Sequence, residues 1–325
     1  MSLFPTETMS QLAQQASHGA YDTYVPLYRK YRPQSLGELV GQETIVQTLT
    51  HAIELHKIVN AYLFCGPRGT GKTSSARIFA KSLNCEQGPT VTPCQTCASC
   101  VSITTGNALD VTEIDAASNN GVDDIRELTE RVQFAPIQGK FRIYIIDEVH
   151  MLSTAAFNAL LKTLEEPPPS VIFIFATTEA HKVLPTIISR CQRYGFSRIT
   201  RQQIEARLRW VAEQESIQIQ DEALTAIARN ARGGMRDALS LLDQVSVIGK
   251  AESTSIDAEL IRTMIGALTE DKVIALTSAI TNQDPVTLVT LLQELVEIGI
   301  DIPQIVRGCV HHYRHMMLID RKSVV

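Results

Sequence analysis

A glycine-rich stretch in the first quarter of the chain has the residue types that hold phosphate groups. Gly66, Gly71, Lys72 and Thr73 fill the spacing G-x-x-x-x-G-K-[ST]. Glycines let backbone N–H groups approach phosphate oxygens, the lysine reaches the β- and γ-phosphates of a nucleotide, and the threonine hydroxyl binds Mg²⁺. An apolar run at residues 61–65 and a helical pattern after the stretch supply the flanking strand and helix that this chemistry needs, because a helix N-terminus favours an anion.

We therefore predict an ATP site built on the phosphate loop, residues 66–73. The loop residues expected to surround the phosphates are Gly66, Pro67, Arg68, Gly69, Thr70, Gly71, Lys72 and Thr73. The alternative is a glycine-rich turn that binds no ligand, and the strand before it and the helix after it argue against that.

Two adjacent carboxylates follow a second apolar run. Residues 141–146 are nearly continuous in apolar character, as central strands of a parallel sheet are, and Asp147 and Glu148 come directly after them. Beside a phosphate loop, Asp147 is expected to hold Mg²⁺ together with Thr73, and Glu148 to polarise the attacking water. The alternative is an acidic cap on the following helix.

Two more positions are candidates for contact with a phosphate. A third apolar run, residues 171–175, leads to Thr177 and Thr178, and either hydroxyl is placed to meet the γ-phosphate or the water; the alternative is an ordinary β-branched strand end. Arg236 is expected in the first turn of a helix, where the helix dipole disfavours a cation. An anionic partner would explain that position, and pairing with Asp237 or a neighbouring acid is the alternative.

Four cysteines follow the helix of the phosphate loop with the spacing of a metal site. Cys94, Cys97 and Cys100 form C-x₂-C-x₂-C, and Cys85 lies nine residues upstream. Four thiolates complete a tetrahedral structural zinc site; an iron–sulfur cluster and unliganded buried thiols are the alternatives. The other cysteines are expected to pack as small apolar side chains: Cys65, Cys191 and Cys309.

Composition narrows the class of protein further. The 325 residues suffice for two or three domains, and 35 acidic against 30 basic residues exclude a globally basic nucleic-acid binder. No apolar run approaches the roughly 20 residues of a membrane span. Residues 1–23 lack the features of a secretory signal and are expected to be a disordered leader. These features indicate a cytoplasmic protein without a membrane partner.

Strands that alternate with helices predict an α/β fold with a mainly parallel sheet covered on both faces. Beyond residue 199 only helices are predicted, over 201–214, 221–231 and 235–247. The expected domains are a nucleotide-binding core (24–199) with a metal insert (85–100), a small helical lid (200–250) and further helices (251–325).

The order of these motifs resembles the gamma/tau family of bacterial DNA polymerase III, the AAA+ motor subunits of sliding-clamp loaders. The resemblance runs from about residue 24 to the end. Its motifs, besides the phosphate loop and the cysteines, are Tyr28-Arg29-Lys30-Tyr31-Arg32-Pro33, Asp147-Glu148-Val149-His150, Ser189-Arg190-Cys191 and Gly234-Met235-Arg236-Asp237-Ala238-Leu239-Ser240.

The resemblance implies an AAA+ core with a zinc knuckle, a helical lid and the start of an all-α collar domain that is cut short at Val325. It also implies roles for single residues. The segment 28–33, otherwise a basic surface turn, would line the adenine side of the pocket. Arg190 would be the arginine finger inserted into a neighbouring subunit's site, Arg236 the second sensor of the chain's own nucleotide, and Thr178 the first sensor.

The resemblance further implies that ATP hydrolysis, with Mg²⁺ and Zn²⁺ as cofactors, loads the sliding clamp onto primed DNA in a replisome near the bacterial nucleoid. The implied partners are delta- and delta-prime-type subunits, further copies of this chain in a ring-like oligomer, the clamp and primer–template DNA. The alternatives are a branch-migration or helicase-loading motor of the same superfamily, a non-hydrolysing scaffold subunit and a zinc-ribbon nucleic-acid binder.

Overall fold

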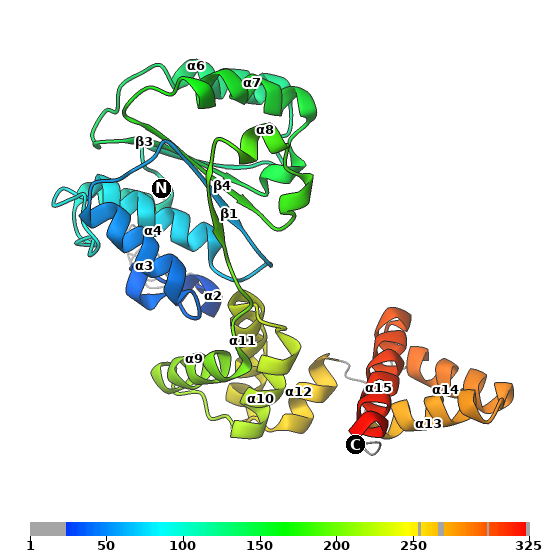
Figure 1. Ribbon diagram of the computed structural model, residues 1–325. Coiled ribbons are helices and arrows are strands. Elements are labelled where there is room, and N and C mark those ends of the chain that lie inside the picture. The colour runs from blue at the N-terminus through cyan, green and yellow to red at the C-terminus, as the bar shows by residue number, and fades with distance from the viewer. Residues whose placement is uncertain (1–23, 253–254, 266–269, 298, 323–325) are drawn as a thin grey trace, which may run out of the picture.

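The computed structural model describes residues 24–252, 255–265, 270–297 and 299–322. The predicted leader, residues 1–23, lies outside them. Three groups of elements follow one another along the chain: an α/β core, a cluster of helices below it in Figure 1, and three further helices to the side.

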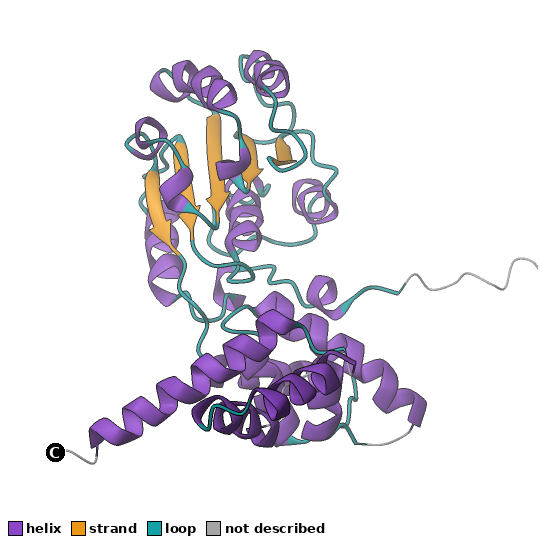
Figure 2. Ribbon diagram, turned by 90° about the vertical axis from the view of Figure 1, so that its right-hand side faces the viewer, coloured by secondary structure: helices purple, strands orange, loops and turns teal. Residues whose placement is uncertain are grey.

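The core is built on one parallel sheet of five strands, which Figure 2 shows side by side. They are β1 (Ala61–Cys65), β2 (Val111–Asp115), β3 (Arg142–Asp147), β4 (Val171–Thr177) and β5 (Gln192–Gly195). Their order is β2-β3-β4-β1-β5, and each neighbouring pair is parallel. All carboxyl ends therefore meet at one edge, and β4 alone separates the strand before the phosphate loop from the strand that ends at Asp147.

Helices cover both faces of this sheet (Figure 1). One layer consists of α3 (Glu43–Glu54) and α4 (Lys72–Asn84), and the other of α6 (Val122–Arg131), α7 (Thr154–Glu165) and α8 (Pro185–Ile188). Successive side chains of a strand point to opposite faces. In β4, Ile172 and Ile174 accordingly pack with the first layer, and Phe173 and Phe175 with the second. The predicted α/β fold is confirmed.

Local sequence signals set several of these boundaries. The Ser153 side chain accepts a hydrogen bond from the backbone N–H of Ala156 and so caps α7 at its start. Several short elements were not predicted, among them strand β5 and helix α5 (Ala98–Thr105). Strand β5 is an edge strand in which only Tyr194 is buried, so it carries no apolar alternation. Helix α5 begins inside the cysteine spacing, where the thiol of Cys97 is its N-cap.

Two helical clusters follow the core. Helices α9 (Arg201–Gln214), α10 (Asp221–Asn230), α11 (Met235–Glu252) and α12 (Ala258–Ile265) share an apolar core with the short N-terminal helix α2 (Leu27–Lys30). The last cluster consists of α13 (Glu270–Thr281), α14 (Pro285–Glu297) and α15 (Ile302–Lys322). Within the described ranges, no helix combines the length and the apolar character that crossing a membrane requires.

We predict that Gly66→Ala destabilises the core. Gly66 has φ 153°, and a Cβ there would lie 2.4 Å from the carbonyl oxygen of Phe196. Strain of this kind costs about 1–3 kcal/mol, so the midpoint of thermal unfolding should fall by several degrees. The matched control is Gly195→Ala on the neighbouring strand, where a Cβ meets nothing within 4 Å. Equal midpoints for both variants would contradict the prediction.

Candidate functional site

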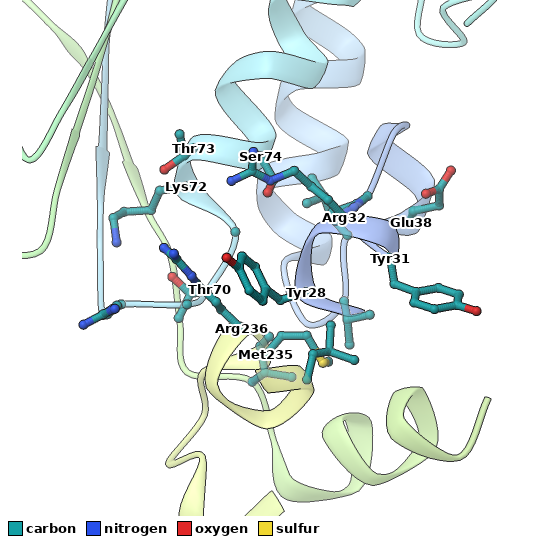
Figure 3. Close-up of a pocket in the computed structure, with 18 of the residues that line it drawn as sticks. Tyr28, Tyr31, Arg32, Glu38, Thr70, Lys72, Thr73, Ser74, Met235 and Arg236 are labelled. Carbon is teal, nitrogen blue, oxygen red and sulfur yellow. The ribbon is translucent and has the colours of Figure 1, made fainter. Parts of the chain in front are cut away.

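A cavity of about 350 Å³ opens at the carboxyl edge of the sheet, between the core and the helical cluster of α9 to α12. Most of its lining comes from four segments: the N-terminal wall (residues 28–40), the phosphate loop, the ends of β2 and β3, and the start of α11; Ile199 and Arg207 complete it. Figure 3 shows Tyr28, Lys72, Thr73 and Arg236 around the same hollow. The volume is in the range of sites for small-molecule ligands and cofactors.

Lys72 at the end of the phosphate loop hydrogen-bonds to backbone groups at its start. Lys72, only 6% exposed, donates from Nζ to the carbonyl oxygens of Gly66 and Pro67, each at 2.9 Å. Gly71, with φ 103°, occupies the N-cap position of α4. Burial lowers the pKa of Lys72, and the nearby carboxylates of Glu148 and Asp147 oppose that shift. The other predicted loop residues line the cavity directly: Arg68, Gly69, Thr70, Gly71 and Thr73.

Thr73 and Asp147, which belong to different elements, meet at the floor of the cavity. The Thr73 hydroxyl donates to Oδ2 of Asp147 at 2.6 Å, and Oδ1 of Asp147 accepts from the backbone N–H of Glu148 at 2.9 Å. A hydroxyl and a carboxylate side by side are the hard oxygen ligands that Mg²⁺ takes in nucleotide sites. The side chains present therefore fit a magnesium ion.

Glu148 is held on the side of Thr178. Its backbone is left-handed (φ 45°, ψ 44°), and its Oε2 accepts hydrogen bonds from the backbone N–H of Thr178 at 3.2 Å and from the Thr178 hydroxyl at 3.0 Å. The Thr178 hydroxyl thus has a carboxylate partner, where we expected it to face a phosphate or water. Thr177 is fully buried and hydrogen-bonds to Nδ1 of His150 at 3.0 Å.

His150 is a residue that our sequence reasoning missed. Its side chain is 7% exposed; Nδ1 lies 3.4 Å from Oε2 of Glu148, and Nε2 lies 3.6 Å from Oε1 of Glu179. The available signal was its place three residues after Asp147 in the same motif.

The start of α11 is joined to the phosphate loop. The backbone N–H of Met235 donates to the carbonyl oxygen of Gly69 at 2.9 Å, and a Cβ on Gly69 would lie 3.0 Å from Cα of Gly234. Arg236 follows in the first helical turn and lines the cavity, with its guanidinium 5.0 Å from the centre of the Tyr28 ring. No ion pair with Asp237 forms in the part of the chain that the structure describes. The chain's own phosphate loop and Arg236 thus share one cavity.

The N-terminal wall is part of the cavity, although Arg29 and Lys30 within it are exposed. Tyr28, Tyr31, Arg32 and Pro33 all line the cavity, and none of these four is among the exposed residues. The Tyr31 ring meets Trp210 of α9 edge-on at 5.5 Å between centroids. Burial and a 2.5 Å hydrogen bond to Glu215 raise the pKa of Tyr31 to about 12.

Arg190 lies outside this cavity, directly after α8. Its guanidinium pairs with Oε1 of Glu165 at 2.5 Å and donates to the carbonyl oxygen of Thr186 at 2.6 Å. The side chain is 32% exposed. The structure therefore separates the two predicted arginines: Arg236 reaches the chain's own cavity and Arg190 does not line it.

The four predicted cysteines come together in the cysteine knuckle (residues 85–100). Their sulfur atoms all lie within 4.8 Å of one another. A tetrahedral zinc site with Zn–S bonds of about 2.3 Å has sulfurs about 3.8 Å apart, so the group fits a zinc ion after a small contraction. Backbone N–H groups of Cys97 and Thr96 lower the pKa of the Cys94 thiol to about 6. Burial raises the pKa of Cys100, so a metal would displace its proton.

Two family models match this chain. Residues 41–200 match the model described as DNA polymerase III, delta subunit, and residues 203–251 match the ATPase lid domain of the DNA polymerase III clamp loader subunit. Among solved structures, the Thermotoga maritima RuvB Holliday junction branch migration motor has a TM-score of 0.57 at 21% identity, over 83% of this chain and 86% of that one. At that identity the likeness shows the fold alone.

Curated relatives are closer in sequence. DNA polymerase III subunit tau of Bacillus subtilis is 48% identical over 91% of this chain and 52% of its own length. The tau subunit of Escherichia coli is 43% identical over 86% of this chain and 43% of its own. The chain thus spans about half the length of the curated relatives it matches. From these matches, this chain belongs to the gamma/tau family of DNA polymerase III subunits.

Proposed function

We propose that this chain is the ATP-hydrolysing motor part of a bacterial DNA polymerase III clamp loader. The observation that carries the proposal is the single cavity shared by the phosphate loop, the Thr73–Asp147 pair and Arg236. Membership of the gamma/tau family and the match to a clamp-loader lid domain support the same function.

In the proposed mechanism, a nucleoside triphosphate competes for the polar groups that now bond to one another. Lys72 exchanges the carbonyl oxygens of Gly66 and Pro67 for phosphate oxygens, while loop N–H groups and the N-terminus of α4 face the anion. The wall residues Tyr28 and Tyr31 receive the base. Electrostatic positioning of this kind supplies most of the catalysis in phosphoryl transfer.

Hydrolysis requires Glu148 to change partners. Thr73 and Asp147 are the residues that would hold Mg²⁺, and the ion would neutralise negative charge on the phosphate groups. Glu148 now accepts hydrogen bonds from Thr178, so it must leave them before its carboxylate can polarise a water. We assign the proton-accepting role to Glu148 and the holding role to Thr178, which also becomes free to sense the γ-phosphate.

The two arginines act on different nucleotides in this proposal. Arg236, at the start of α11, senses the chain's own nucleotide and draws the helical lid (200–250) onto the core. Arg190, paired with Glu165 and outside the cavity, exchanges that carboxylate for the γ-phosphate of a neighbouring subunit. ATP then favours a ring-like assembly of copies of this chain with delta- and delta-prime-type subunits. That assembly holds the clamp open on primer–template DNA in the bacterial cytoplasm.

A branch-migration motor is the second candidate, because the fold resembles RuvB. Sequence identity favours the clamp-loader function over branch migration, since this chain is 48% identical to a tau subunit and 21% identical to the RuvB motor. A non-hydrolysing scaffold subunit is disfavoured by Lys72, Thr73, Asp147 and Glu148, all in place around one cavity.

We predict that Lys72→Ala and Glu148→Gln fail at different steps. Lys72→Ala should weaken ATP binding about 10- to 100-fold, because a hydrogen bond to a charged group contributes about 1.5–3 kcal/mol. Glu148→Gln should keep its affinity and lose turnover by about 10²–10⁴-fold. Equilibrium binding and phosphate release measure the two effects, with the exposed Lys57→Ala as control. Equal loss of affinity in both variants would refute this division of roles.

We predict one zinc ion per chain, bound by the cysteine knuckle. Cys97→Ser should lower the zinc content and the midpoint of thermal unfolding, because a structural zinc site contributes folding free energy. Cys309→Ser, a cysteine of α15 outside the knuckle, should keep its zinc. A folded chain of unaltered sequence that contains no zinc would rule out the site.

We predict that Arg190 acts in trans and Arg236 in cis. In the isolated chain, Arg236→Ala should lower ATP affinity, whereas Arg190→Ala should leave it nearly unchanged. In the loader assembled from the full-length protein, Arg190→Ala should reduce stimulated hydrolysis by about 10³–10⁵-fold. Arg262→Ala, which removes an exposed arginine of α12, is the control.

Mixed assemblies make this test stricter. A ring that combines Arg190→Ala and Lys72→Ala subunits still contains interfaces where an intact ATP site meets an intact arginine, so it should be more active than either variant alone. Impaired ATP binding by the isolated Arg190→Ala chain would contradict the trans assignment.

A further inference from the structure

The cysteine knuckle contacts the N-terminal wall of the cavity, although the two are far apart in the sequence. Helix α4 begins at Lys72 in the phosphate loop and ends at Asn84, one residue before Cys85. A helix of 13 residues is about 20 Å long, so the chain itself carries the knuckle away from the loop. The N-terminal wall nevertheless connects the knuckle to the cavity, because Gln34 of the wall is hydrogen-bonded directly to the knuckle.

Gln95 makes this contact from inside the turn that joins two of the cysteines. Its backbone is left-handed, with φ 63°. Its amide Nε2 donates to the carbonyl oxygen of Gln34 at 2.9 Å. The backbone N–H of Cys97 donates to Sγ of Cys94 at 3.3 Å across the same turn. The turn that brings the two sulfurs together therefore also directs Gln95 at the wall.

Lys81 joins the same groups from helix α4. It is 2% exposed, and its Nζ donates to Oε1 of Gln34 at 2.7 Å and to Oε1 of Gln95 at 2.8 Å. A buried ammonium whose partners are neutral is costly. Burial lowers the pKa of Lys81, and charge on the nearby Cys100 and Glu38 raises it. Four thiolates around Zn²⁺ carry net negative charge, so a metal-loaded knuckle would add to Glu38 a counter-charge that neither amide provides.

Gln34 connects this cluster to the cavity. Its Nε2 donates to the carbonyl oxygen of Arg32 at 2.9 Å, and its backbone N–H donates to Oε2 of Glu38 at 2.9 Å. Arg32 and Glu38 both line the cavity, and Figure 3 labels them on the wall. The contacts therefore run without a break from the cysteine turn, through Gln95 and Gln34, to the surface that faces a ligand.

We propose that the metal-bound knuckle holds the N-terminal wall in its nucleotide-binding position through Gln95 and Lys81, so that metal and nucleotide binding are coupled. This rests on the nucleotide site of the proposed function. Neither residue lines the cavity, so both are positioning residues. The coupling is reciprocal, since a metal that raises nucleotide affinity is itself bound more tightly when nucleotide is present.

The test removes the bridge and leaves all four cysteines. Gln95→Gly deletes the amide and suits the left-handed backbone. The matched control is Gln283→Gly, an exposed glutamine between α13 and α14 that also has positive φ (56°). Three quantities are measured on the whole chain: the zinc content, the affinity for a fluorescent ATP analogue and the rate of hydrogen exchange in residues 31–39. Gln95→Gly should keep its zinc, lose affinity by about 5-fold or more and exchange faster in the wall; Gln283→Gly should match the unaltered chain.

A purely structural role would change stability without changing affinity. Unchanged affinity in Gln95→Gly, whether zinc is kept or lost, would therefore overturn the coupling while the proposed function stands. An unaltered chain that binds zinc but no nucleotide would overturn the proposed function instead. Lys81→Met is the second variant. The double variant Lys81→Met/Gln95→Gly should lose less ATP affinity than the product of the two single fold-losses, because both side chains act through Gln34. If the fold-loss of affinity in the double variant equals the product of the two single fold-losses, the two residues act independently and the proposed path through Gln34 is wrong.

Discussion

The arrangement of the cavity depends on one close approach between the phosphate loop and the lid. The backbone N–H of Met235 donates to the carbonyl oxygen of Gly69, and the lack of side chains on Gly69 and Gly234 allows the two backbones to touch. This contact sets the start of α11, and therefore the distance of Arg236 from the loop that begins α4. Any side chain at Gly69 would meet backbone atoms, so the lid would have to move outward and carry Arg236 with it.

The polar groups around the cavity satisfy one another. Lys72 bonds to loop carbonyl oxygens, Thr73 to Asp147, and Glu148 to Thr178. In the proposed mechanism these bonds are exchanged for bonds to the nucleotide, its ion or the water, and the new bonds must be of similar strength. An anionic ligand is thus favoured, since it would form stronger, charge-assisted hydrogen bonds with Lys72 than the neutral carbonyl oxygens do.

The sequence predicted most elements of the α/β core, but few of the hydrogen bonds that join distant segments of it. The phosphate loop, the strand before Asp147 and the spacing of the four cysteines are local patterns, and local chemistry determines them. Strand β5 has one buried residue, and its existence depends on pairing with β1. The partners of Thr178, Gln34 and His150 are equally non-local, because each bond joins segments that only the folded sheet or the knuckle brings together.

The N-terminal wall is fixed from both sides, and this determines how motion can reach the cavity. Tyr31 is attached to the helical lid through Glu215 and Trp210, whereas Gln34 is attached to the core through the knuckle. Between them lie Arg32 and Pro33, where the proline ring fixes one dihedral and restricts the residue before it. A rotation of the lid against the core must therefore change the backbone at Arg32 and Pro33, or break the contacts of Tyr31 or of Gln34. Since Arg32 and Pro33 line the cavity, a ligand that contacts them stabilises one relative position of lid and core.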